Sequence, residues 1–211
     1  DMMVAISTEV KKRIKKYYAR DSKIIFPPVD VPNHQSSIIN HQSDQYYLLV
    51  SRLDYGYKKV DLAIKAFNKL NLPLVIVGTG REENKLRKMA KDNIIFAGRV
   101  DESKLKEFYK GAAALIMPQE EDFGIVSVEA QSFGLPVIAY KKGGASDTVI
   151  NGKTGLLFNK QNVNTLINAV RHYHNSNHGS EIHRNCLKNA ERFSKANFKK
   201  EFLALTKKVL H

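Results

Sequence analysis

Two glutamates, Glu121 and Glu129, are separated by seven residues in the stretch 118–144, which reads PQEEDFGIVSVEAQSFGLPVIAYKKGG. A carboxylate accepts hydrogen bonds, so each of the two side chains can bind the hydroxyl groups of a sugar. The stretch follows a short apolar run, and we expect a helix to begin between the two glutamates. The pair therefore predicts recognition of hydroxyl groups on both sides of a helix start.

The expected helix start is itself suited to an anion. Phe123, Gly124 and Ile125 would supply the first backbone amides, which have no partner within the helix and lie at the positive end of its dipole. Gly124 has no side chain to block a phosphate. Gly143 and Gly144 follow the next strand, and we expect them to bring further bare amides to the same place. These features predict a phosphate-binding site.

The two glutamates then have different expected ligands. Glu129 lies about five residues past the helix start, which is roughly 7 Å along the axis at 1.5 Å per residue. That distance is about one ribose from a bound phosphate, so Glu129 is expected to accept hydrogen bonds from both ribose hydroxyls. Glu121 precedes the helix, on the other side of the phosphate, where a sugar attached to a diphosphate would lie.

The elements that position these residues follow from hydrophobic patterning. From residue 46 onward, short apolar runs alternate with amphipathic segments, which predicts an α/β fold. The fold class is a Rossmann-like parallel sheet with helices on both faces, and its ligand is expected at the carboxyl ends of the strands. The predicted strands are Tyr46–Val50, Leu74–Val77, Ile94–Phe96, Ala114–Met117, Val137–Tyr140 and Gly155–Phe158, and the predicted helices are Val60–Leu70, Glu82–Lys91, Glu102–Ala112, Gly124–Phe133 and Asn162–Asn175.

The ends of the chain carry separate units. A strand at Met2–Ile6, a helix capped by Ser7 and a strand at Ile24–Phe26 are predicted within residues 1–30. Residues 31–45 are polar and without periodicity, which indicates a linker. The main domain is expected over residues 46–193, with a terminal helix over residues 194–211.

The stretch 118–144 contains Phe-Gly, Glu-Ala, Gly-Leu-Pro-Val-Ile-Ala and Gly-Gly in succession. It closely resembles the signature of retaining GT-B glycosyltransferases of family 4, and the chain is similar to bacterial mannosyltransferases of that family. The resemblance implies the nucleotide-sugar-binding, C-terminal half of such an enzyme. It implies retaining hexose transfer in polysaccharide or glycolipid assembly, without a metal or another cofactor. GDP-mannose is the favoured donor and a UDP-hexose the next.

The resemblance also assigns residues outside the glutamate stretch. Arg52 and Lys58 are similar to the family's basic pair, which neutralises the diphosphate and stabilises it as a leaving group. Their loop is one residue longer than usual, so either Lys58 or Lys59 reaches the phosphate. Val100 is expected to form an apolar wall for the nucleobase. Glu102 either contacts a base edge or is simply an acidic residue in the first turn of a helix.

Other motifs are interpreted as structural. Gly78-Thr79-Gly80 predicts a tight turn between a strand and a helix, and Glu83 stands where a dinucleotide fingerprint needs its third glycine. The spacing of His172, His174 and His178 matches no zinc site, and we expect a polar helix end followed by a loop there.

Composition limits the size of the core and indicates the compartment in which the protein is expected. The chain has 211 residues, 43% of them hydrophobic, which is enough for one good core. Its one cysteine, Cys186, excludes an internal disulfide and indicates a reducing compartment. Neither a leader sequence nor an apolar run of membrane-spanning length is evident. A cytoplasmic location is expected, with peripheral contact at the inner face of the membrane.

The net charge of +13 is concentrated in two terminal helices, around residues 11–16 and 199–208. A solvated basic face is the simple interpretation, and contact with a membrane or a lipid-linked acceptor is the functional one. The expected partners are the nucleotide-sugar donor, an N-terminal acceptor domain that is missing here, and a second copy bound through the exposed terminal helices. Nucleic acid is not expected. The alternatives are a noncatalytic nucleotide-sugar-binding module and a basic nucleic-acid-binding domain.

Overall fold

The computed structural model describes residues 2–32, 46–54, 56–176 and 179–210. Its centre is a six-stranded sheet in which every neighbouring pair of strands is parallel, with the order β5-β4-β3-β6-β7-β8. This confirms the predicted α/β class and the parallel sheet. The strands are β3 (Tyr47–Val50), β4 (Leu74–Val77), β5 (Ile94–Gly98), β6 (Leu115–Met117), β7 (Val137–Tyr140) and β8 (Gly155–Phe158).

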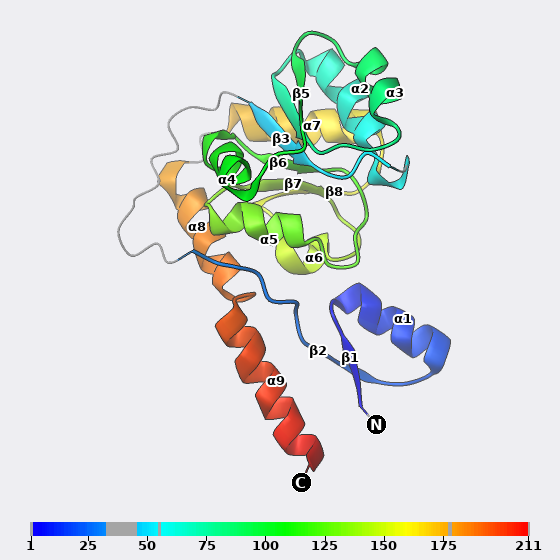
Figure 1. Cartoon of the computed structure of the whole chain (residues 1–211), viewed down its shortest axis with the longest axis vertical. Coiled ribbons are helices and arrows are strands. Elements are labelled where there is room, and N and C mark those ends of the chain that lie inside the picture. The colour runs from blue at the N-terminus through cyan, green and yellow to red at the C-terminus, as the bar shows by residue number, and fades with distance from the viewer. Residues whose placement is uncertain (1, 33–45, 55, 177–178, 211) are drawn as a thin grey trace.

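Helices cover both faces of the sheet (Figure 1), because its strands are apolar on both sides. Successive residues of β6 show this: Ile116 packs into one core cluster, whereas Leu115 and Met117 pack into the other. The first cluster lies under α2 (Val60–Leu70), α3 (Glu83–Met89) and α7 (Val163–Asn175). The second lies under α4 (Glu102–Gly111), α5 (Ile125–Ser132) and α6 (Ala145–Thr148).

A smaller unit precedes this domain. It consists of β1 (Met3–Ala5), α1 (Thr8–Tyr18) and β2 (Ser22–Ile24), with the two strands parallel. Ser7 caps α1 as predicted, because its hydroxyl accepts a hydrogen bond from the Val10 amide at 3.1 Å. The second strand lies two residues earlier than predicted. It pairs with β1, which ends at Ala5 because the cap of α1 follows almost at once.

Polar contacts from Thr8 and Arg13 join this unit to the main domain. The amide and hydroxyl of Thr8 donate to the Asp147 carboxylate, at 2.8 and 2.6 Å. Arg13 forms an ion pair with Asp122, in the loop before α5. The N-terminal unit is therefore attached at the same edge of the domain as the glutamate stretch.

Two long helices end the chain, α8 (Gly179–Glu191) and α9 (Lys195–Leu210), and α9 extends away from the sheet (Figure 1). The sequence predicted the terminal helix but no helix over residues 179–191, where α8 lies. His172 and His174 are in the last turn of α7, whereas His178 lies outside the described residues. Most of the predicted linker, residues 33–45, also lies outside them.

The turn Gly78-Thr79-Gly80 is built against the loop that follows β3. Gly78 has φ +132°, and a Cβ placed on it would lie 1.9 Å from the Ser51 carbonyl oxygen. A Cβ on Gly80 would lie 2.3 Å from the Leu53 carbonyl carbon. Both positions therefore require glycine, because backbone rather than a movable side chain is in the way.

We expect Gly78→Ala to destabilise the fold by roughly 2–4 kcal/mol, since the loops after β3 and β4 must separate. Gly98→Ala is the matched control. Gly98 also has a positive φ, +70°, but an added Cβ would meet nothing within 4 Å. That variant should lose only about 1–2 kcal/mol. Urea unfolding of both variants measures the difference, and equal losses would contradict the role given to the close approach.

Candidate functional site

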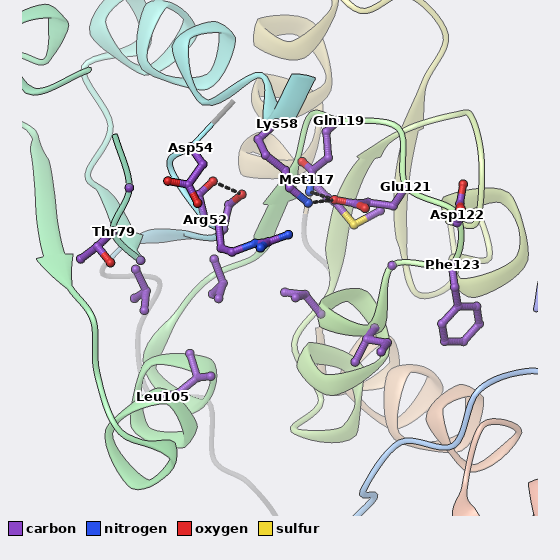
Figure 2. A pocket seen from close by; sticks show the side chains of 18 of the residues that line it. Arg52, Asp54, Lys58, Thr79, Leu105, Met117, Gln119, Glu121, Asp122 and Phe123 are labelled. Carbon is purple, nitrogen blue, oxygen red and sulfur yellow. Dashed lines mark hydrogen bonds and ion pairs between the residues drawn. The ribbon is translucent and has the colours of Figure 1, made fainter. Parts of the chain in front are cut away.

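A cavity of about 870 Å³ opens at the carboxyl ends of the central strands, where parallel α/β sheets bind their ligands. Figure 2 shows side chains converging on it from several loops. The residues that line it come from the loops after β3, β4, β5 and β6, from the start of α5 and from the N-terminal unit; they are Ile6, Pro27, Val50–Arg52, Asp54, Lys58, Val77–Gly80, Arg99, Val100, Leu105, Met117, Gln119 and Glu121–Val126.

The amino end of α5 forms one wall of this cavity. Gly124 is the cap, in the left-handed conformation at φ +83°, and no side chain caps the helix. The Ile125 and Val126 amides at the start of α5 have no helical partner by position, and both residues line the cavity, whereas the Ser127 amide donates to the Gly124 carbonyl at 2.9 Å. Phe123 and Gly124 line it as well, so the predicted anion-binding segment faces the cavity.

Gly143 and Gly144 lie against the backbone that leads into α5. A Cβ on Gly143 would lie 2.1 Å from the Glu121 carbonyl oxygen, and one on Gly144 would lie 2.1 Å from the Phe123 carbonyl oxygen. The Gly144 amide donates to the Glu121 carbonyl at 2.8 Å. Neither glycine lines the cavity. The Gly144 amide is therefore already engaged, and both glycines pack against the backbone of residues 121–123, while their role toward a ligand stays a prediction.

Lys58 and Glu121 meet within the cavity. The Lys58 Nζ lies 2.5 Å from Glu121 Oε1, and the two side chains are only 14% and 25% exposed. Gln119 donates to the same oxygen at 3.3 Å. Arg52 enters the cavity nearby (Figure 2). Lys59 does not line the cavity; it precedes α2 with φ +55°. Of the two lysines that the sequence left open, Lys58 is thus the one at the cavity.

Glu129 lies on α5, one helical turn after Val126, which lines the cavity, and it is partly buried. It is not among the lining residues, and its Oε2 accepts a hydrogen bond of 3.1 Å from the buried hydroxyl of Tyr109, on α4. Burial raises the pKa of Glu129 above its ordinary value, the hydrogen bond from Tyr109 lowers it, and the charge of Glu102 raises it. Burial above all raises the pKa of Tyr109, with the charge of Glu129 and their hydrogen bond adding to it.

Of the two residues predicted to contact the base after β5, one lines the cavity and the other does not. Val100 lines the cavity, as an apolar wall would require. Glu102 does not; its side chain is 81% exposed and pairs with Lys106 at 2.6 Å. Asp101 caps α4, because its carboxylate accepts a hydrogen bond from the Lys104 amide. This geometry favours the first-turn acid among the two interpretations of Glu102.

Sequence reasoning missed Arg99 and Gln119, which both line the cavity. Each follows a predicted strand within a few residues, so its position at the carboxyl edge of the sheet was the available signal. In the part of the chain that the structure describes, no three histidine, cysteine or carboxylate side chains gather where they could hold a metal ion. No described helix is both long and apolar enough to cross a bilayer.

Comparison with known proteins adds a family match. The family model described as "Glycosyl transferases group 1" matches residues 32–193. An uncharacterised glycosyltransferase of Methanocaldococcus jannaschii is 26% identical over 200 residues, which is 92% of this chain and 55% of that protein. The GDP-mannose-dependent alpha-(1-6)-phosphatidylinositol monomannoside mannosyltransferase of Mycobacterium tuberculosis is 37% identical over 110 residues, 46% of this chain and 29% of that one.

Solved structures share the fold. A protein from Anabaena, in a complex with UDP and glucose, has a TM-score of 0.83 at 19% identity over 98% of this chain and 62% of its own. The chain therefore spans about half of the length of the first relative and less than two thirds of this structure. The structural neighbours are GT-B glycosyltransferases, of which the chain matches one half.

The raised pKa of Glu129 predicts a pH-dependent stability. Because the folded carboxyl holds its proton more tightly than the unfolded one, this group lowers stability as pH rises from the ordinary glutamate pKa through the folded one. Glu129→Gln removes the charge and keeps an acceptor for Tyr109. We expect this variant to be at least as stable as the unchanged chain at pH 7, with the difference shrinking toward pH 4.

Urea unfolding across that pH range measures the effect. Glu201→Gln, on the exposed surface of α9, is the control and should show no such pH dependence. If the free energy of unfolding of Glu129→Gln rose further above that of the unchanged chain as the pH fell, the inferred cost of burying the Glu129 charge would be contradicted.

Proposed function

Because this chain belongs to the glycosyl transferases group 1 family, we propose that its cavity binds a nucleotide diphosphate sugar. The reaction is retaining, metal-independent transfer of a hexose, in the assembly of a polysaccharide or glycolipid. GDP-mannose is the favoured donor, in keeping with the mannosyltransferase relative, and a UDP-hexose is the next, in keeping with the UDP complex of the structural neighbour.

One observation carries this proposal: two cationic side chains, Arg52 and Lys58, share a cavity with the uncapped start of α5. A diphosphate needs compensation of its charge, and a cavity partly enclosed by protein strengthens each such contact. The first amides of α5 add donors along the positive end of the helix dipole. Arg99 places a third cation at the same cavity.

Different residues are proposed to bind the different parts of the donor. During transfer, the bond between the anomeric carbon and the diphosphate oxygen breaks, and the nucleoside diphosphate leaves with the electron pair. The oxygen of an acceptor hydroxyl bonds to the same carbon, and its proton passes to the leaving diphosphate. Arg52 and Lys58 are proposed to stabilise this leaving group, and Glu121 to bind hydroxyls of the hexose. Glu129 is proposed to bind the ribose, and Val100 to contact the base.

The Lys58–Glu121 ion pair describes the cavity before a donor binds. Both side chains are largely withdrawn from solvent, so neither charge is fully compensated by water. A donor that brings phosphate to Lys58 and hydroxyls to Glu121 replaces one compensated pair by two sets of contacts. The pair thereby keeps both side chains inside the cavity before the donor arrives.

Binding of donors tests the proposed function directly. We expect GDP, GDP-mannose or their UDP counterparts to raise the melting temperature, because a ligand at a hundred times its dissociation constant adds about 2.7 kcal/mol of stability. ADP-glucose is the matched control for the base. An unchanged melting temperature with every nucleotide would overturn the proposal.

Substitution of the basic residues tests the geometry. Arg52→Ala and Lys58→Ala should each weaken GDP binding by roughly tenfold to a hundredfold, since a charge-assisted hydrogen bond contributes about 1.5–3 kcal/mol. The nucleoside guanosine should bind each variant nearly as well as before. Lys59→Ala is the control, because Lys59 lies outside the cavity. Calorimetry decides, and a larger loss in Lys59→Ala than in Lys58→Ala would contradict the placement.

The acceptor is proposed to bind to a further domain, because the chain spans only part of its relatives. Orientation of two reactants requires groups on both sides of them. The residues described here are therefore expected to bind a radiolabelled donor and to transfer none of its hexose. Transfer by this chain alone would contradict that division.

Helix α1 has no buried residue and carries several lysines, which supports contact with an anionic membrane near a lipid-linked acceptor.

A further inference from the structure

A hydrogen bond between side chains joins α4 to α5 next to the cavity. The Tyr109 hydroxyl donates to Glu129 Oε2 at 3.1 Å. Tyr109 is 2% exposed, and its ring stacks on Phe133 with 5.7 Å between centroids and 15° between planes. An immobilised ring places its hydroxyl at one point, and a buried tyrosine hydroxyl needs a partner. The Glu129 carboxylate is thus held from one side by a rigid donor.

The contact lies one helical turn from the cavity. Leu105 precedes Tyr109 by four residues on α4, and Val126 precedes Glu129 by three on α5; both Leu105 and Val126 line the cavity. Residues three or four apart lie on the same helix face. Both members of the Tyr109–Glu129 pair therefore share the helix faces that line the cavity, just beyond its edge.

The two oxygens of the carboxylate are not equivalent. Oε2 accepts from Tyr109, whereas Oε1 accepts no hydrogen bond from any residue that the structure describes. Burial already disfavours the charged form of this group, and the tyrosine bond offsets part of that effect on its pKa. A half-buried carboxylate with one oxygen bound and the other unused is suited to receive donors from a ligand.

We propose that Tyr109 is a positioning residue, which orients Glu129 so that its second oxygen accepts hydrogen bonds from the ribose hydroxyls of the donor. This inference rests on the proposed function. It adds a residue that does not touch the ligand and that belongs to a different helix from the carboxylate it orients. Ribose recognition then depends on the packing of α4 against α5 as well as on Glu129.

Tyr109→Phe tests the inference, because it keeps the ring and its stacking on Phe133 while removing the hydroxyl. Calorimetry compares GDP and UDP with their 2′,3′-dideoxy counterparts. We expect the variant to bind the ribonucleotides roughly threefold to tenfold more weakly, the effect of one hydrogen bond, and to bind the dideoxy compounds with unchanged affinity. A merely structural role for Tyr109 would weaken both kinds of ligand alike.

Tyr46→Phe is the matched control. Its hydroxyl also bonds to α4, donating to the Phe108 carbonyl at 3.0 Å, but it is not bonded to Glu129. This variant should bind all four compounds as the unchanged chain does. Equal losses for ribose and dideoxyribose compounds in Tyr109→Phe, or no loss at all, would overturn the positioning role alone. If the unchanged chain binds neither GDP nor UDP, the proposed function and this inference fall together.

Discussion

The position of Glu121 depends on backbone packing between two loops at the edge of the sheet. Glu121 and Gly143 form an isolated parallel bridge, and the Gly144 amide donates to the Glu121 carbonyl. The absence of side chains on both glycines lets the loops approach this closely. Because α5 begins only a few residues after Glu121, the same contact fixes the helix start. The anion-binding end and the carboxylate are therefore positioned together.

Buried polar side chains extend this support away from the cavity. Gln131 of α5 and Asn189 of α8 both donate to the Thr148 carbonyl, at 2.8 Å each, and Asn189 also donates to Gln131 at 2.7 Å. Thr148 in turn donates to the Gly144 carbonyl at 3.0 Å. Satisfied networks of this kind specify one arrangement, because an alternative would leave buried groups unpaired. They connect α8 to the loop beneath Glu121.

The two glutamates are held by different means, in keeping with their different proposed ligands. Glu121 is paired with a cation, the Lys58 ammonium, which in the proposed complex also contacts the diphosphate. Glu129 has a rigid partner, the stacked ring of Tyr109. In the proposed reaction the hexose passes to the acceptor, whereas the ribose leaves as part of the nucleoside diphosphate. The two proposed ligands therefore end in different products.

The sequence by itself determined the sheet, because buried parallel strands are continuous apolar runs; β4, β7 and β8 have the predicted bounds, as does α2. It also determined that Arg52, Glu121 and the start of α5 meet, since each follows a strand whose carboxyl end lies at one edge.

Only the tertiary structure decided between Lys58 and Lys59, because a single residue of loop length reverses which side chain enters the cavity. It alone showed α8, whose polar Asn189 is buried by partners 41 and 58 residues away, and the supporting place of Gly143 and Gly144. Such contacts between distant segments leave no periodic signal in the local sequence.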